Sequence, residues 1–254
     1  MLRDQRSQLQ REVRAVDTAD RAHAPVVVAI DGPSGSGKST VSRAVAARLG
    51  LSFLDTGAMY RAMTWWMLAN DIDVADPEAV AVACGKPVIV SGTDADGPTI
   101  TVDGRDVSGP IRGPEVTVQV SAVSAVPAVR ARLVELQRGC AGVAERGIVA
   151  EGRDMGSVVF PTATVKVFLT ASEAARAERR ATELRAKGLD EATITAMAAD
   201  LARRDAADSS RATAPLTQAA DAVLVDTSEL TLEQVIDRIT TLVEQRAGAA
   251  LSTV

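Results

Sequence analysis

The sequence has almost no histidine, and its single His23 lies in a polar stretch before the first apolar run. A catalytic triad built on histidine, or a histidine-ligated metal site, is therefore excluded from the rest of the chain. Cysteine is scarce as well: Cys84 and Cys140 stand alone, without the paired spacing of a metal site. Two free thiols suit a reducing compartment, and we expect a cytoplasmic protein.

Aromatic residues make up only 2% of the 254 residues, and the net charge is −5. Both argue against a nucleic-acid surface, which depends on basic patches and stacking. No apolar run approaches the roughly 18 residues that a membrane helix needs, and the first 24 residues lack the apolar core of a secretory signal. We therefore expect a monomer that binds small molecules, with no nucleic-acid or membrane partner.

One glycine-rich motif stands out against these absences. Val26–Ile30 is an apolar, mostly β-branched run, and Gly32-x-x-x-x-Gly37-Lys38-Ser39 follows it before a stretch with helical spacing. Glycines let backbone N–H groups converge on one point, and the positive end of the next helix adds to that field. A chance match is the alternative, but the strand before and the helix after argue against it. The motif predicts a phosphate cradle formed by Gly32, Pro33, Ser34, Gly35, Ser36, Gly37, Lys38, Ser39 and Thr40, with Lys38 on the outer phosphates and Ser39 on Mg²⁺.

Apolar runs alternate with helical patterns along the rest of the chain. Strands are expected at about 26–30, 51–54, 147–151, 163–169 and 221–226, and helices at about 40–49, 58–69, 77–84, 127–145, 172 onward, 191–204 and 231–245. Right-handed crossovers would join the strands into a five-stranded parallel sheet covered on both faces. Between Lys86 and Gly113 the rhythm breaks, and alternation at Lys86–Ser91 and Thr99–Val107 predicts an inserted antiparallel hairpin with little helix.

A phosphate cradle is shared by switches, transport ATPases and small-molecule kinases. A GTPase would need an Asn-Lys-x-Asp guanine reader, but the only asparagine is Asn70, and no Ser-Gly-Gly-Gln signature of a transport ATPase is present. Phosphoryl transfer needs alignment and positive charge rather than covalent chemistry from the protein. A chain poor in histidine, with 24 arginines, meets that need.

Longer segments resemble one family. They are Ala29–Thr40, Leu54–Arg61, Ile111-Arg112, Glu151–Pro161 and Arg211–Leu216, in an order that extends over about residues 26–246. On these segments the chain resembles the bacterial cytidylate kinases, within the nucleoside-monophosphate kinase group of P-loop proteins. The resemblance implies transfer of the γ-phosphoryl group of ATP to CMP or dCMP, with Mg²⁺. It also implies a three-layer α/β P-loop NTPase fold with a five-stranded parallel sheet, a monophosphate-binding insertion and a helical lid.

The resemblance assigns domains and residues. It implies a leader at 1–24, one kinase domain at 25–246 with the insertion at about 58–146 and the lid at about 172–212, and a tail at 247–254. The catalytic residues would be Lys38, Arg61 and Arg211, and the lid residues on ATP would be Arg176, Arg179 and Arg180. On CMP, the resemblance implies that the base is read by Thr56, Ser121, Arg130 and Asp154, that the sugar is contacted by Arg204 and Asp208, and that the phosphate is held by Arg61 and Arg211.

Three positions depart from the family pattern. Thr56 stands where serine is common, Ser39 replaces a frequent glycine, and Ala206-Ala207 makes the end of the lid less basic. The alternatives are a kinase for UMP or another small acceptor, and an ATP-binding module without enzymatic activity.

Overall fold

The computed structural model describes residues 25–186, 188, 190 and 216–251. The leader at 1–24, the predicted helix at 191–204, and the predicted site residues Arg204, Asp208 and Arg211 lie outside the described residues.

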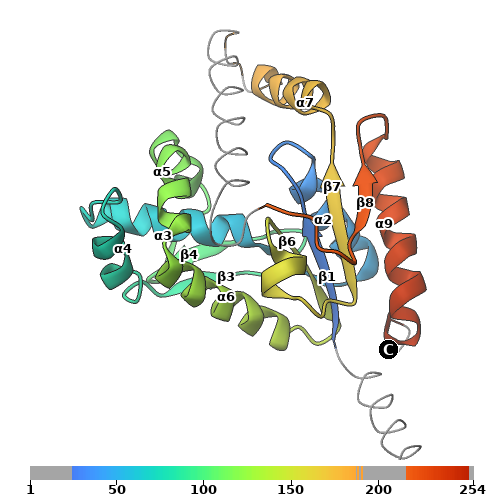
Figure 1. Ribbon diagram of the computed structural model, residues 1–254, viewed down its shortest axis with the longest axis horizontal. Helices are drawn as coiled ribbons and strands as arrows, with labels where there is room; N and C mark the ends of the chain where they lie inside the picture. The colour runs from blue at the N-terminus through green and yellow to red at the C-terminus, as the bar shows by residue number, and fades with distance from the viewer. Residues whose placement is uncertain (1–24, 187, 189, 191–215, 252–254) are drawn as a thin grey trace, which may run out of the picture.

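A parallel sheet forms the centre of the molecule (Figure 1). Its strands are β2 (Ser52–Asp55), β6 (Gly147–Gly152), β1 (Val26–Asp31), β7 (Val165–Thr170) and β8 (Val223–Asp226), adjacent in that order and all parallel. The predicted five-stranded parallel sheet is therefore confirmed. Runs of β-branched residues form these strands because their side chains pack well on a pleated surface that is buried on both faces.

The two faces of the sheet bury separate apolar clusters. Val28 and Ile30 of β1 point to the face covered by α2 (Lys38–Leu49) and α9 (Leu232–Ala247). Ala29 points to the other face, which is covered by α3 (Thr56–Ala69) and α6 (Pro127–Gly142). This alternation follows the two-residue period of a strand. Because β1, β2 and β6 pair in parallel, their carboxyl ends meet at one edge of the sheet.

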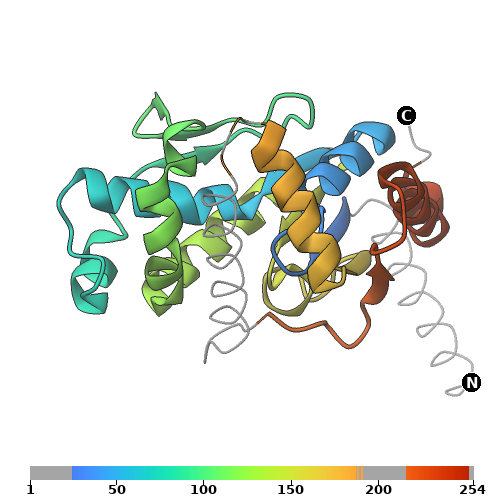
Figure 2. The same ribbon diagram turned by 90° about the horizontal axis from the view of Figure 1, so that it is seen from above.

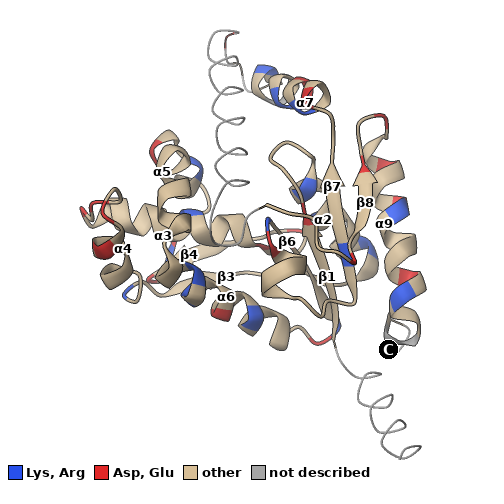
Figure 3. Ribbon diagram, viewed as in Figure 1, with Lys and Arg blue, Asp and Glu red and all other residues tan. Residues whose placement is uncertain are grey.

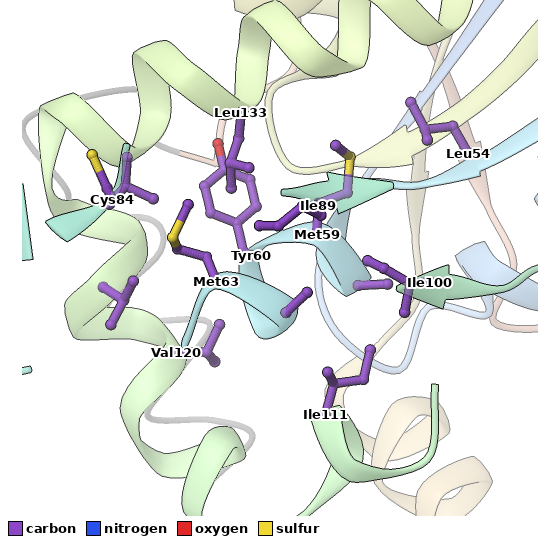
Figure 4. Packing of buried hydrophobic residues seen from close by; sticks show 14 of the residues in the cluster. Leu54, Met59, Tyr60, Met63, Cys84, Ile89, Ile100, Ile111, Val120 and Leu133 are labelled. Carbon is purple, nitrogen blue, oxygen red and sulfur yellow. The ribbon is translucent and has the colours of Figure 1, made fainter. Parts of the chain in front are cut away.

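Helix α3 is the centre of a second lobe, on the side of α4, α5 and β3 in Figure 1. Its Met59, Tyr60 and Met63 project into a cluster of side chains to which every other element of this lobe except the exposed β5 contributes (Figure 4). The other elements of this lobe are α4 (Pro77–Ala83), β3 (Ile89–Ser91), β4 (Ile100–Val102), β5 (Arg105–Asp106), the short helix η1 (Pro110–Arg112), α5 (Pro114–Ala125) and α6.

Two expectations for this lobe need correction. The strand expected over Thr99–Val107 turns back at Asp103-Gly104, both with positive φ, so the hairpin gains a third strand. The segment after Gly113 is helix α5, which the sequence analysis did not predict. Its valines alternate as in a strand, but Pro114 at the first helical position starts a helix that buries Val116, Val120 and Val123, one helical face.

The loop between β3 and β4 closes the open edge of the large sheet. The Phe53 N–H in edge strand β2 donates to the Thr93 carbonyl at 2.8 Å. The Arg43 guanidinium of α2 donates to the carbonyls of Ala95 and Asp96 at 3.1 and 3.2 Å. This loop satisfies a strand edge that would otherwise be exposed, and it ties the second lobe to the core.

None of the helices within the described ranges is long and apolar enough to cross a membrane.

Candidate active site

A cavity of about 770 Å³ opens at the carboxyl edge of the parallel sheet. This edge is where open α/β sheets bind ligands, since loops there connect strands to helix N-termini. The glycine loop from Ser34 to Val41 lines one side, and residues of α3, α5, α6 and the turn after β6 line the other. Donor cradle and second lobe therefore share one cavity, with room for two nucleotides to meet.

The glycine loop has the backbone geometry of an anion cradle. Gly35 and Gly37 have φ of 76° and 87°, a region that residues with a Cβ rarely adopt. A Cβ on Gly32 would lie 2.0 Å from the Leu169 carbonyl oxygen of β7. The Lys38 Nζ donates to the Pro33 carbonyl at 2.8 Å, so its ammonium stands over the loop where phosphates would bind.

Glu151, at the end of β6, is a buried acid that the sequence analysis did not single out. Its side chain lines the cavity, the Ser39 hydroxyl hydrogen-bonds to it, and its Oε1 has no hydrogen-bond partner among the described residues. Burial, helped by the nearby charge of Asp55, raises the pKa of Glu151 to about 7, while Lys38 opposes the shift. Its only sequence signal was an acid ending an apolar strand beside the glycine loop.

The base-reading residues expected from the sequence lie together across the cavity. Arg130 Nη2 of α6 and Asp154 Oδ2 form a salt bridge whose side chains are 6% and 3% exposed. The Arg130 guanidinium also lies over the Tyr60 ring, 5.6 Å from its centroid. Beside them, the Thr56 hydroxyl donates to the Glu151 carbonyl at 2.6 Å, and Ser121 lines the same cavity.

Three further arginines line the same cavity. Arg61 Nη1 donates to the Ile111 carbonyl at 3.2 Å and to the Thr117 hydroxyl at 2.9 Å. Arg112 pairs with Asp55 at 3.6 Å. Arg153, which the sequence analysis did not assign, donates to the Ser34 hydroxyl and, at 3.4 Å, to the Gly32 carbonyl. All three line the cavity and concentrate positive charge where two phosphate chains would meet.

Helix α7 (Glu173–Ala186) crosses above the glycine loop (Figure 2), and its ribbon is coloured at arginine and glutamate positions along its length (Figure 3). Arg176 Nη1 donates to the Ser34 carbonyl at 3.1 Å, and Arg179 donates to the hydroxyl and carbonyl of Thr227. Arg179 and Arg180 line the cavity. The helix that was expected as a lid thus touches the donor cradle directly.

The structure brings most of the expected site residues into one cavity. Ser34 to Thr40 line it together with Thr56, Arg61, Ser121, Arg130, Asp154, Arg179 and Arg180; Gly32, Pro33 and Arg176 stand behind its wall. The cavity is also lined by the apolar residues Leu230, Leu232 and Val235, near Thr227. The sequence analysis did not predict them as site residues, and only their position after the last strand could have indicated them.

Known proteins resemble this chain over nearly its whole length. The family model described as cytidylate kinase matches residues 28–245. A cytidylate kinase of Streptomyces avermitilis is 61% identical over 231 residues, which are 91% of this chain and 98% of that protein. One of Streptomyces coelicolor is 65% identical over 224 residues, 88% and 95% of the two chains. One of Mycolicibacterium paratuberculosis is 52% identical over 225 residues, 89% and 98% of the two chains. A match of this extent shows that the chain belongs to the cytidylate kinase family.

Proposed function

We propose that this protein transfers the γ-phosphoryl group of ATP to CMP or dCMP, giving ADP and CDP or dCDP. The observation that carries this proposal is the polarity of the base-reading residues. Asp154 offers carboxylate oxygens as acceptors, and Arg130 offers only N–H donors. The Thr56 hydroxyl donates its proton to the Glu151 carbonyl, so it offers a ligand only acceptor lone pairs. Cytosine presents the complementary set, a 4-amino donor next to the acceptors N3 and O2.

Uracil presents the opposite groups at two of these positions. Its O4 is an acceptor and would face the acceptors of Asp154 and Thr56, and its N3–H is a donor and would face Arg130. A site built to hydrogen-bond particular substrate groups rejects an analogue strongly, because its own buried polar groups are then left unpaired. The arrangement therefore favours CMP over UMP.

The phosphate side of the cavity supports in-line transfer between two phosphates. An ionised phosphate oxygen of CMP attacks the γ-phosphorus, a new P–O bond forms, and the bond to the bridging oxygen of ADP breaks with its electron pair. No general base is needed because the nucleophile is already ionised. Lys38, Arg61 and Arg153 would stabilise the charge on the transferred group, and Arg211, outside the described residues, would join them.

The residues present fit a Mg²⁺ ion with the ATP phosphates. Magnesium prefers oxygen ligands and keeps several waters, and the unpartnered Oε1 of Glu151 lies on a side chain that also bonds the Ser39 hydroxyl. Ser39 and Glu151 would hold the ion, directly or through water. When bound, the metal neutralises charge on the β- and γ-phosphates.

Thr227, Leu230, Leu232 and Val235 are proposed to face the adenine ring. They form an apolar wall beside the glycine loop, and Arg179 and Arg180 reach the same end of the cavity from α7. An aromatic base fits such a wall with an arginine over its face. Closure of α7 would then exclude water from the transfer.

We further propose a cytoplasmic, monomeric enzyme that acts on small nucleotides. Cys84 and Cys140 are free thiols, as in a protein from a reducing compartment.

A coupled assay of ADP release across CMP, dCMP, UMP and AMP tests the proposal. We expect turnover with CMP and dCMP, weak turnover with UMP, and none with CMP in Lys38→Met. ATP binding without ADP release for any acceptor would instead identify a binding module. A preference for UMP would contradict the polarity argument and leave phosphoryl transfer standing.

A further inference from the structure

Asp31 is a buried acid next to the glycine loop whose carboxylate is bonded to the turn after β6. It ends strand β1, is 4% exposed, and does not line the cavity. Its Oδ1 accepts the Met155 N–H at 2.7 Å, and its Oδ2 accepts the Gly156 N–H at 2.8 Å. Both donors belong to the first turn of the short helix η2 (Met155–Val159), which follows β6.

The first N–H groups of any helix lack partners within the helix. The residue in the N-cap position normally supplies its own side-chain oxygen to them, and aspartate is among the best residues for this task. In η2 the N-cap residue is Asp154, yet its side chain makes no capping hydrogen bond. Its carboxylate points instead to Arg130, at the cavity wall.

These observations explain each other. Asp31 satisfies the N–H groups that Asp154 would otherwise have to cap, and the Asp154 carboxylate instead accepts from Arg130 at the cavity wall. We propose that Asp31 is a positioning residue for base selection: it caps η2 from the neighbouring strand so that Asp154 can read the cytosine. The inference rests on the proposed function, because it assumes that Asp154 faces the base.

As the N-cap residue of η2, Asp154 could use its carboxylate to cap this helix instead of contacting Arg130. Without the Asp31 carboxylate, the buried Met155 and Gly156 N–H groups would lose their acceptor, and Asp154 occupies the N-cap position whose side chain ordinarily serves such groups. Capping by Asp154 would break its contact with Arg130. Loss of Asp31 should therefore appear as lost selectivity for cytosine and not only as lost stability.

The ionised form of Asp31 is the one that accepts two N–H groups. Burial raises its pKa to about 6, with the two backbone N–H groups and Lys38 acting in the opposite direction and the charge of Asp154 adding to the rise. Lys166 of β7 lies close as well, since its Cδ would be 3.2 Å from a Cβ on Gly156. Assays are therefore best run at pH 8, where the Asp31 carboxylate is charged.

The test compares kcat/KM for CMP and UMP in full-length variants. We expect Asp31→Ala to lower the CMP-to-UMP ratio about tenfold or more, by loss of the Asp154 contact. Asp31→Asn, which keeps one acceptor oxygen, should lower the ratio by less. Val28→Ala, a cavity-forming change in the same strand away from the site, should destabilise the protein and leave the ratio unchanged.

A double variant separates positioning from a general effect. In an Asp154→Ala background the further change Asp31→Ala should no longer alter the CMP-to-UMP ratio, because both residues act through one carboxylate. An unchanged ratio in Asp31→Ala, or an undiminished effect in the Asp154→Ala background, would overturn the inference. If Asp31→Ala does not fold, a wild-type ratio in Asp31→Asn overturns it. A wild-type enzyme inactive on CMP would instead reject the proposed function itself.

Discussion

The Thr56 hydroxyl donates its only proton to the Glu151 carbonyl at 2.6 Å, so only its lone pairs are available to a ligand. A threonine hydroxyl can ordinarily donate or accept, and alone it would not discriminate between cytosine and uracil. The hydrogen bond to the Glu151 carbonyl in β6 removes the ability of Thr56 to donate to a ligand. Gly152 lets the Thr56 hydroxyl approach β6, since a Cβ on Gly152 would lie 2.8 Å from Thr56 Oγ1.

Replacing Thr56 by valine should reduce selectivity for cytosine. The change keeps the shape and removes the acceptor, so kcat/KM for CMP should fall about tenfold, while KM for ATP changes little. Thr56→Ser keeps the hydroxyl and should stay near the wild type. Thr64→Val is the matched control, because the Thr64 hydroxyl is also buried on α3 and bonded to a backbone carbonyl, outside the cavity. Equal losses in Thr56→Val and Thr64→Val would count against a reading role.

Replacing Asp154 by alanine should cost stability as well as activity. It leaves the Arg130 charge buried without its partner, and breaking such a pair costs about 3–5 kcal/mol of unfolding free energy. Denaturant unfolding measures this cost. Arg48→Ala breaks two pairs whose members are far more exposed, at 38% for Arg48, 65% for Glu233 and 62% for Asp237, and should lower the free energy of unfolding much less. Binding of ATP by Asp154→Ala should persist, and its loss would mean that Asp154 supports the donor side.

The raised pKa of Glu151 predicts a pH dependence of stability in the absence of nucleotide and metal. An acid whose folded pKa of about 7 exceeds its ordinary 4.5 holds its proton more tightly when folded. The free energy of unfolding should therefore fall as pH rises from 4.5 to 7, by on the order of 3 kcal/mol, and then level off.

Glu151→Gln should remove most of that decline, so its Tm at pH 8 should exceed that of the wild type, while its activity with MgATP falls. Asp31, whose pKa is raised from 3.8 to about 6, should cause a decline of similar size in the free energy of unfolding between about pH 4 and 6, and this decline remains in both proteins. Glu135→Gln on the exposed side of α6 is the control and should follow the wild type. A wild-type Tm that is flat between pH 5 and 8 would show that burial does not penalise the Glu151 charge.

Gly32 should not tolerate a side chain. Its φ of 146° lies where residues with a Cβ are strained, and an added Cβ would meet the Leu169 carbonyl oxygen at 2.0 Å. Gly32→Ala should therefore destabilise the fold by at least about 3 kcal/mol. Gly97→Ala, with nothing within 4 Å of the added Cβ, should stay within about 0.5 kcal/mol of the wild type. Thermal unfolding of Gly32→Ala and Gly97→Ala, each compared with the wild type, measures this difference in stability.

The sequence by itself determined the phosphate cradle, the five parallel strands and most of the residues around the cavity. The cradle and the strands depend on local pattern: the glycine spacing of Gly32–Ser39, and apolar β-branched runs such as Val26–Ile30 between turn signals. The residues across the cavity from the glycine loop came from the resemblance to one family. It failed at α5, where alternating valines resemble a strand and only packing against α3 and α6 selects a helix.

Only the tertiary structure decided what those residues can do. Burial beside Ser39 leaves Glu151 Oε1 without a hydrogen-bond partner among the described residues, and the Thr56 hydroxyl donates to a backbone carbonyl 95 residues away. The cap that Asp154 does not supply comes from Asp31, 123 positions earlier in the chain. Burial and hydrogen-bond direction arise when distant segments meet, so no local pattern encodes them. The glycine loop predicts the chemistry of phosphate; the contacts across the sheet edge determine which base is accepted.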